Sequence, residues 1–335
     1  MLKKIICALL AAAVIVSATA CQGVSEEQKT GQTPEQKGGF IENEVIFNSS
    51  EDLILLSQGN VKSIIVNFDG TVNCLCMYDL ASDEEGIKQS VFAINGNEGE
   101  PLCKDFGAKF GESYNLLSVD EGYAYAETYQ SKSASFTEST IMMASITDDN
   151  SEAVRLSILD ALPQNVEKKV FQLQALPQNR YIVAVLNSES QPSKLNYFVI
   201  DAASNESYEL LSNIEVSAGL TIRYISETDE LAIRRQKDGK GSVGVFSLGE
   251  KKMLSEETTF SYEGGYSILA GADAEAIYFV DGGGINRVTR GGTIVERIME
   301  AKRYELNSPQ WTPLDAVRTP DGEFYVTMFN NILIW

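Results

Sequence analysis

Few side chains in this sequence are of the kinds that usually carry catalysis. The 335 residues include 47 Asp and Glu, 27 Lys and Arg and five Cys, but no His. Without an imidazole, the chain cannot build a Ser-His-Asp triad, a Cys-His pair or a His-liganded zinc site. We therefore predict that the protein is not an enzyme and that it has no catalytic residues, no cofactor and no metal ion.

Carboxylate pairs are the one catalytic option that this composition leaves. Glycoside cleavage needs two acids at a defined separation, one of them with a raised pKa, and the sequence singles out no such pair. The acidic run DDNSE at residues 148–152 offers oxygen ligands for calcium. It lacks the alternating acidic spacing and the closing Glu of a helical calcium loop, so we expect an exposed hairpin tip.

Two further patterns have a structural and a functional interpretation. Tyr123, Tyr125 and Tyr129 alternate along one strand-like run, which places them on one face. They would form an aromatic platform for a sugar or, as we favour, pack between sheets. The glycines at residues 282–284 lack both the Lys-Ser/Thr of a phosphate loop and a following helix, so we expect a corner between strands.

Three of the five cysteines fall in the folded part of the chain. Cys74 and Cys76 are two residues apart in a strand-like run, so their side chains leave one face in parallel, which does not suit a mutual disulfide. We expect Cys74, Cys76 and Cys103 to act as small core residues. A disulfide from either of the first two to Cys103 is the alternative.

Cys21 directly follows a secretory signal. Lys3 and Lys4 give the positive start, residues 5–16 are apolar, and small residues (SATA) precede the cysteine. This arrangement resembles the lipobox of bacterial lipoproteins, with Ala18 where that family usually has Leu. The resemblance implies cleavage before Cys21, lipidation of Cys21 and attachment to the outer face of the bacterial cell membrane. An ordinary secreted protein with cleavage elsewhere is the alternative.

Composition divides the chain into three segments: a signal peptide at residues 1–20, a polar disordered tether at 21–40 and a folded domain at 41–335. Cleavage would remove Lys3 and Lys4, which leaves 25 basic against 47 acidic residues, a net charge of −22. Such a body is repelled by nucleic acid. We expect a monomer whose partners are the membrane, through the lipid on Cys21, and a protein or glycan ligand.

From residue 42 onward, short β-branched and aromatic runs alternate with turn residues, and Pro163 breaks the one short helical stretch. The runs form six units that turn near Gly70, Gly122, Asn179, Asp229, Asp273 and Gly322. The turns are between 44 (229 to 273) and 57 (122 to 179) residues apart. All-strand repeats of this period are typical of propeller blades. We predict an all-β fold, a β-propeller of about six four-stranded blades closed by an N-terminal strand near residues 44–47.

Over residues 42–335 this texture resembles secreted bacterial propellers of the NHL or WD-like type, although the Trp-Asp dipeptide of WD repeats is missing. It also looks like the propeller-like region of some solute-binding transport lipoproteins, in which a ligand-capturing domain would follow Trp335. The resemblance implies a membrane-anchored extracytoplasmic binding or scaffold lipoprotein that binds at one mouth of its central channel. An accessory role in solute uptake, as a truncated solute-binding lipoprotein, and a carboxylate-dependent glycan-active enzyme stay open.

Overall fold

The chain divides into two units, residues 1–38 and 39–335, and every residue described below belongs to the second. The computed structural model describes residues 43–44, 46–47, 59–79, 87–95, 98–103, 106–111, 114–128, 140–148, 150–187, 192–216, 220–237, 239–301, 313–327 and 332–334. The predicted signal peptide, the tether and Cys21 lie outside these residues, so the predicted segment boundaries stay predictions.

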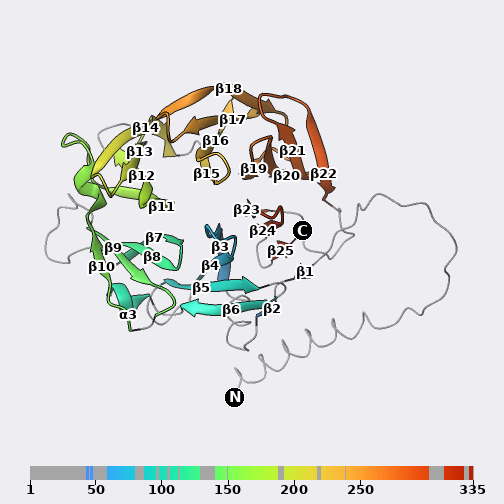
Figure 1. Ribbon diagram of the computed structural model, residues 1–335. Coiled ribbons are helices and arrows are strands. Elements are labelled where there is room, and N and C mark those ends of the chain that lie inside the picture. Colours follow the sequence, from blue (N-terminus) through green and yellow to red (C-terminus); the bar gives the residue numbers. More distant parts are fainter. Residues whose placement is uncertain are drawn as a thin grey trace, which may run out of the picture. The chain divides into compact units, whose positions relative to one another are not determined.

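The described strands form six sheets around a common centre (Figure 1). The first sheet contains β2 (Ile46–Phe47), β3 (Gly59–Val66), β4 (Val72–Asp79), β5 (Ile87–Asn95) and β6 (Glu98–Cys103). The second contains β7 (Tyr114–Asp120), β8 (Tyr123–Thr128), β9 (Thr140–Ser145) and β10 (Val154–Leu156). The third contains β11 (Val170–Leu176), β12 (Arg180–Asn187), β13 (Lys194–Asp201) and β14 (Glu206–Glu215).

The remaining three sheets follow in chain order. The fourth contains β15 (Thr221–Ile225), β16 (Glu230–Lys237), β17 (Lys240–Ser247) and β18 (Lys252–Phe260). The fifth contains β19 (Ser267–Ala272), β20 (Ala276–Asp281), β21 (Gly284–Thr289) and β22 (Val295–Glu300). The sixth contains β1 (Asn43–Glu44), β23 (Asp315–Arg318), β24 (Phe324–Thr327) and β25 (Ile332–Ile334). The short helices are α3 (Gly107–Phe110) and the 3-10 helix η1 (Ser157–Ala161), which ends just before Pro163.

The predicted all-β propeller is confirmed. In five sheets, antiparallel neighbours follow one another in sequence from an innermost strand outward, which is the arrangement of a propeller blade. The structure therefore has five full blades, and the predicted number of about six is corrected. The last repeat provides only short strands, so the sixth sheet consists of strands of two to four residues.

The N-terminal segment reaches two different sheets. Asn43 pairs with Ile334, so β1 runs antiparallel to β25 at the edge of the sixth sheet. β2 runs parallel to β6 at the outer edge of the first sheet, a pairing that the repeat did not predict. Closure of the ring by the N-terminal strand stays a prediction, and the deletion described in the Discussion tests it.

The hydrophobic core lies between the sheets. Each of six clusters of buried residues joins two neighbouring sheets, including one in which Ile64 and Phe92 of the first sheet meet Val317 and Tyr325 of the sixth. All six residues of β20 are buried, because a strand in the middle of a blade is covered on both faces. Burying one large apolar side chain contributes about 1.5–3 kcal/mol, so this packing is the main force that holds neighbouring sheets together.

Two local expectations are also answered by the structure. Cys74 and Cys103 are buried in separate clusters, as expected of core residues. The glycines at 282–284 form the corner between β20 and β21. Gly284 has a φ of +139°, and a Cβ built there would lie 1.9 Å from the carbonyl oxygen of Met299. Only glycine fits that corner.

Candidate central binding cavity

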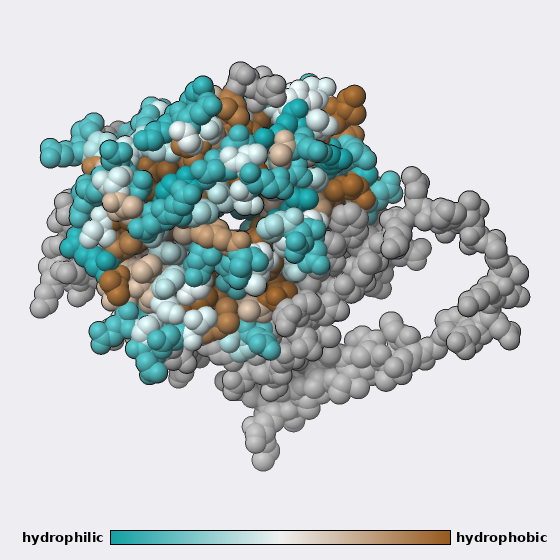
Figure 2. Space-filling view, viewed as in Figure 1, coloured by the Kyte–Doolittle hydropathy of each residue, from teal (hydrophilic) through white to brown (hydrophobic). Residues whose placement is uncertain are grey.

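A cavity of about 670 Å³ lies at the centre of the ring. Residues from the innermost strand of every sheet line it: β3, β7, β11, β15, β19 and β23. The space-filling view shows an opening at the centre of a face that is mostly hydrophilic (Figure 2). A volume of this size lies in the ~300–1,000 Å³ range of pockets that hold small organic ligands.

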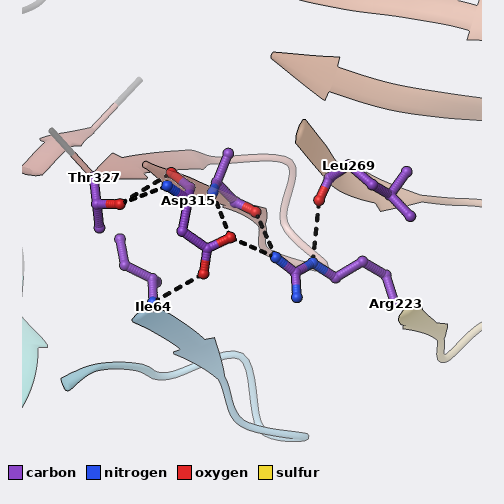
Figure 3. Close-up of polar contacts among 6 residues, drawn as sticks. Ile64, Arg223, Leu269, Asp315 and Thr327 are labelled. Carbon is purple, nitrogen blue, oxygen red and sulfur yellow. Dashed lines mark hydrogen bonds and ion pairs between the residues drawn. The ribbon is translucent and has the colours of Figure 1, made fainter. Parts of the chain in front are cut away.

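One ion pair crosses the cavity wall (Figure 3). Arg223 on β15 reaches past β19, where its Nε donates to the carbonyl oxygen of Leu269 at 3.2 Å. Its Nη2 donates to Asp315 Oδ1 at 2.7 Å and to the carbonyl oxygen of Ala316 at 3.1 Å on β23. Asp315 Oδ2 accepts a hydrogen bond from the backbone N–H of Ile64 on β3 at 3.4 Å. This pair therefore links the inner edges of four sheets.

Several polar groups of the cavity wall have no such partner. Arg223 Nη1 makes no hydrogen bond or ion pair with any described residue (Figure 3). The same holds, within the described part of the chain, for the side chains of Gln172 and Gln174 on β11 and Thr221 on β15. The wall thus offers amide, hydroxyl and guanidinium groups that can bond a ligand.

Two aromatic rings lie at one end of the cavity. Phe68, in the turn between β3 and β4, has 44% of its surface exposed. Its ring centroid lies 6.3 Å from that of Tyr224 on β15, in an edge-to-face arrangement. The hydroxyl of Tyr224 donates to Asp229 Oδ1 at 3.0 Å, which fixes the orientation of the ring. An exposed aromatic ring beside a cavity provides an apolar contact surface for a ligand.

The turns that join each innermost strand to the next strand form one series, which we call the inner turns. At five successive boundaries between sheets, an acidic side chain in or beside an inner turn bonds to a group of the neighbouring sheet. The acceptors and donors are Glu121 Oε1 with Phe68 N (2.6 Å), Asp120 Oδ2 with Ala175 N (3.3 Å), Asp229 with Arg180 (2.6 and 3.0 Å), Glu227 Oε2 with Ala274 N (3.0 Å) and Asp273 with Arg318 (3.6 Å). These contacts place the turns of the repeat next to one another around the ring.

Two adjacent carboxyl groups beside the inner turns, those of Asp120 and Glu121, have raised pKa values. Burial raises the pKa of Asp120, against hydrogen bonds from Ser118 and the Ala175 N–H that lower it. Burial also raises the pKa of Glu121, and the charge of Asp120 adds to the effect. Their side chains nevertheless diverge, because Asp120 bonds to the third sheet and Glu121 to the first. They do not form the convergent acid pair that glycoside cleavage needs.

The other candidates from the sequence are not brought together. Tyr125 is buried and packs edge-to-face on Tyr181 at 6.1 Å, so it packs between sheets as we favoured. Tyr123 is exposed, and Tyr129 and Cys21 lie outside the described residues.

Around Asp148, the chain forms an exposed tip between β9 and β10, with Asn150 N donating to Asp148 Oδ1 at 3.0 Å. Within the described residues, no group of three side chains has the positions of metal ligands.

The sequence did not single out the residues that make the cavity. Arg223 is the single charge in the strand TIRYI, and Asp315 begins the strand DAVR, which ends in Arg318. A charge in an innermost strand is the signal that could have marked them. Phe68 lies in the turn NFDG, whose Asp-Gly indicated only the turn.

Comparisons with known proteins found similar solved structures but no matching family or curated sequence. No protein-family model matches the chain, and no curated protein sequence matches it. Among solved structures it is similar to the β-propeller domain of the Trilobed protease from Pyrococcus furiosus (11% identity, TM-score 0.44, 83% of this chain and 82% of that one). It is also similar to TolB from Acinetobacter baumannii (11%, 0.42, 76% and 60%) and to a puromycin-hydrolyzing peptidase from Mycobacterium tuberculosis (13%, 0.40, 81% and 43%).

The chain thus spans less than half the length of that peptidase. The class defined by the sheets themselves is a β-propeller with a central cavity. No helix among the described residues has the length and apolar character needed to cross a membrane.

Proposed function

We propose that this chain is an extracytoplasmic binding lipoprotein, held at the membrane through Cys21, whose propeller recognises its ligand in the central cavity. The observation that carries the binding role is the cavity itself, which is lined by the innermost strand of every sheet. Hydrogen-bonding groups without partners face it, and two aromatic rings lie at one end. The anchoring part of the proposal rests on the signal sequence before Cys21.

The size of the site supports a small ligand or a short segment of a larger one. A stable protein–protein interface usually buries ~1,200–2,000 Å² of a fairly flat surface. A concave site of about 670 Å³ suits instead a ligand that enters the ring. The innermost strands belong to sheets packed against one another, so the site is rigid and little ordering cost accompanies binding.

Binding without turnover is the test of this proposal. The detergent-purified full chain is titrated calorimetrically with short saccharides, tripeptides and polyamines, and each mixture is then analysed for products by mass spectrometry. We expect saturable binding with the ligand recovered unchanged. Formation of a cleavage product from a saccharide would favour the glycan-active enzyme instead. Failure of all three ligand classes to bind would refute the use of the cavity as a binding site.

A further inference from the structure

We propose that the cavity is a site for a short neutral saccharide, stacked on Phe68 and hydrogen-bonded by Gln172, Gln174 and the outer edge of Arg223. This inference rests on the proposed binding function and names the chemical class of the ligand. Three properties of the cavity lead to it: its arginines are already paired with carboxylates, its available polar groups both donate and accept, and an exposed aromatic ring adjoins them.

The two arginines in the cavity wall are each paired with a carboxylate. The wall carboxylates Asp120 and Glu227 accept hydrogen bonds from backbone N–H groups. Arg223 is paired with Asp315 at 2.7 Å, and their side chains are only 23% and 19% exposed. Arg318 is paired with Asp273 at 3.6 Å and lies over the ring of Tyr278. A ligand with a buried negative charge would therefore meet no unpaired cation and would lose its hydration without compensation. A neutral ligand avoids this cost.

The polar groups of the wall that have no partner among the described residues can form hydrogen bonds with sugar hydroxyls. A sugar hydroxyl both donates and accepts hydrogen bonds, and the carboxamides of Gln172 and Gln174 also do both. Arg223 Nη1 adds two further N–H donors, held in place by the three bonds that its Nε and Nη2 already make. A purely apolar ligand would leave these groups desolvated and unpaired, at a cost of ~1–3 kcal/mol each. The polar part of the wall thus excludes a hydrocarbon ligand.

Phe68 provides the contact for the less polar face of a sugar ring. The π face of an aromatic ring is electronegative and attracts C–H groups laid over it. Phe68 keeps 44% of its surface exposed because Tyr224 meets it edge to face rather than covering it. The hydrogen bond from its backbone N–H to Glu121, at 2.6 Å, holds the turn that carries the ring.

The experiment compares ligands and variants on the detergent-purified full chain. Maltotriose, cellotriose and N-acetylglucosamine trisaccharide are titrated against wild type, Phe68→Ala and Gln174→Ala by calorimetry. We expect at least one saccharide to bind, and each of the two substitutions to weaken it about 5-fold or more. The matched controls are Phe171→Ala, which removes an exposed phenylalanine of β11 that does not line the cavity, and Gln164→Ala on the surface. Both should stay within about 2-fold of wild type.

The salt dependence of the Kd and saturation-transfer NMR give two further tests of how the saccharide binds. The Kd for a neutral sugar should change less than about 2-fold between 50 and 500 mM NaCl, since screening acts on charge–charge attraction. Saturation-transfer NMR should show the largest transfer to sugar C–H protons that face an aromatic ring, and it should be weaker with Phe68→Ala.

The outcomes separate this inference from the proposed function. Binding of spermine or of a tripeptide that is lost in Phe68→Ala, without binding of any saccharide, would overturn the saccharide inference and leave the binding function standing. Saccharide binding that is unaffected by both cavity substitutions would also overturn it, because the sugar would then bind elsewhere. Absence of binding by every probe would overturn both.

Discussion

The guanidinium of Arg223 and the carboxylate of Asp315 meet at 2.7 Å, although their strands β15 and β23 are separated in the ring by β19. The two residues are 92 positions apart in the chain. The contact satisfies carbonyl groups on β19 and β23 and an N–H on β3 that would otherwise face the cavity. It ties the small sixth sheet to three others from the inside.

Removal of this pair should destabilise the ring. We expect Asp315→Asn and Arg223→Met each to lower the free energy of unfolding by about 1–3 kcal/mol, because a polar partner is then left unpaired in the wall. The double variant should cost less than the sum of the single ones, with a coupling of at least ~0.5 kcal/mol in urea unfolding. Glu250→Gln breaks an exposed pair with Lys252 and should stay within about 0.5 kcal/mol of wild type. Strict additivity would show that the pair makes no net contribution.

The corner at Gly284 should not accept a side chain. Gly284→Ala forces a Cβ to within 1.9 Å of the Met299 carbonyl oxygen at a φ of +139°, so we expect a loss of at least ~2 kcal/mol of stability. Gly249→Ala is the matched control, since a Cβ there meets nothing within 4 Å. Equal melting temperatures for the two variants would contradict the geometry of the corner.

Asp120 should make stability depend on pH. Burial raises its pKa in the folded state above the ~3.9 of a free carboxyl, so the folded chain binds this proton more tightly than the unfolded chain does. Its contribution to stability is therefore present at low pH and is lost as pH rises from about 4 through the raised pKa. The Asp120→Asn variant has no titrating carboxyl at this position, so its stability does not fall with pH in this way. Urea unfolding between pH 4 and 7 should show the variant gaining stability relative to wild type, and parallel curves would refute the prediction.

The N-terminal segment should be needed to close the ring. Deletion of residues 41–56 would remove β1 from β25 and β2 from β6, together with eight apolar residues of the sequence. Burial of one such side chain contributes ~1.5–3 kcal/mol, and a domain has only ~5–15 kcal/mol in total. We expect aggregation or loss of cooperative melting. Deletion of residues 22–37 is the control and should leave the melting temperature unchanged. Equal stability of both deletions would rule out closure by this segment.

Lipidation should depend on Cys21. Cys21→Ser should abolish incorporation of a fatty-acid analogue in a bacterial host, because the thiol sulfur is the acceptor that the lipobox resemblance implies. Cys7→Ser changes the other cysteine of the N-terminal region and should leave labelling intact. Persistent labelling of the Cys21 variant would refute the anchor.

The turns of the repeat could be predicted because their signals are local. Gly70, Gly122, Asn179, Asp229 and Gly322 all have positive φ, a conformation that favours Gly, Asn and Asp over other residues. The continuous apolar runs of strands such as β20 indicated burial on both faces. These two signals were enough to predict the all-β propeller, but not the number of full blades.

The binding cavity could not be predicted in the same way. The contact between Arg223 and Asp315 depends on how six separate sheets are arranged, and no short window of sequence contains both residues. The orientation of Phe68 depends on Tyr224, which is 156 positions further along the chain. The same is true of Asp120 and Glu121, which are adjacent in sequence but bond to different neighbouring sheets.

The inner turns perform one task with different chemistry at each boundary. Glu121 and Glu227 accept hydrogen bonds from backbone N–H groups of the neighbouring sheet. Asp229 and Asp273 form ion pairs with arginines of the neighbouring sheet. Each boundary between sheets therefore needs an acceptor that faces a donor, and it does not need a particular residue type. The units of the ring can thus differ in sequence and still be joined in the same way. In this molecule they are alike in spacing and geometry, while the residues that join them differ.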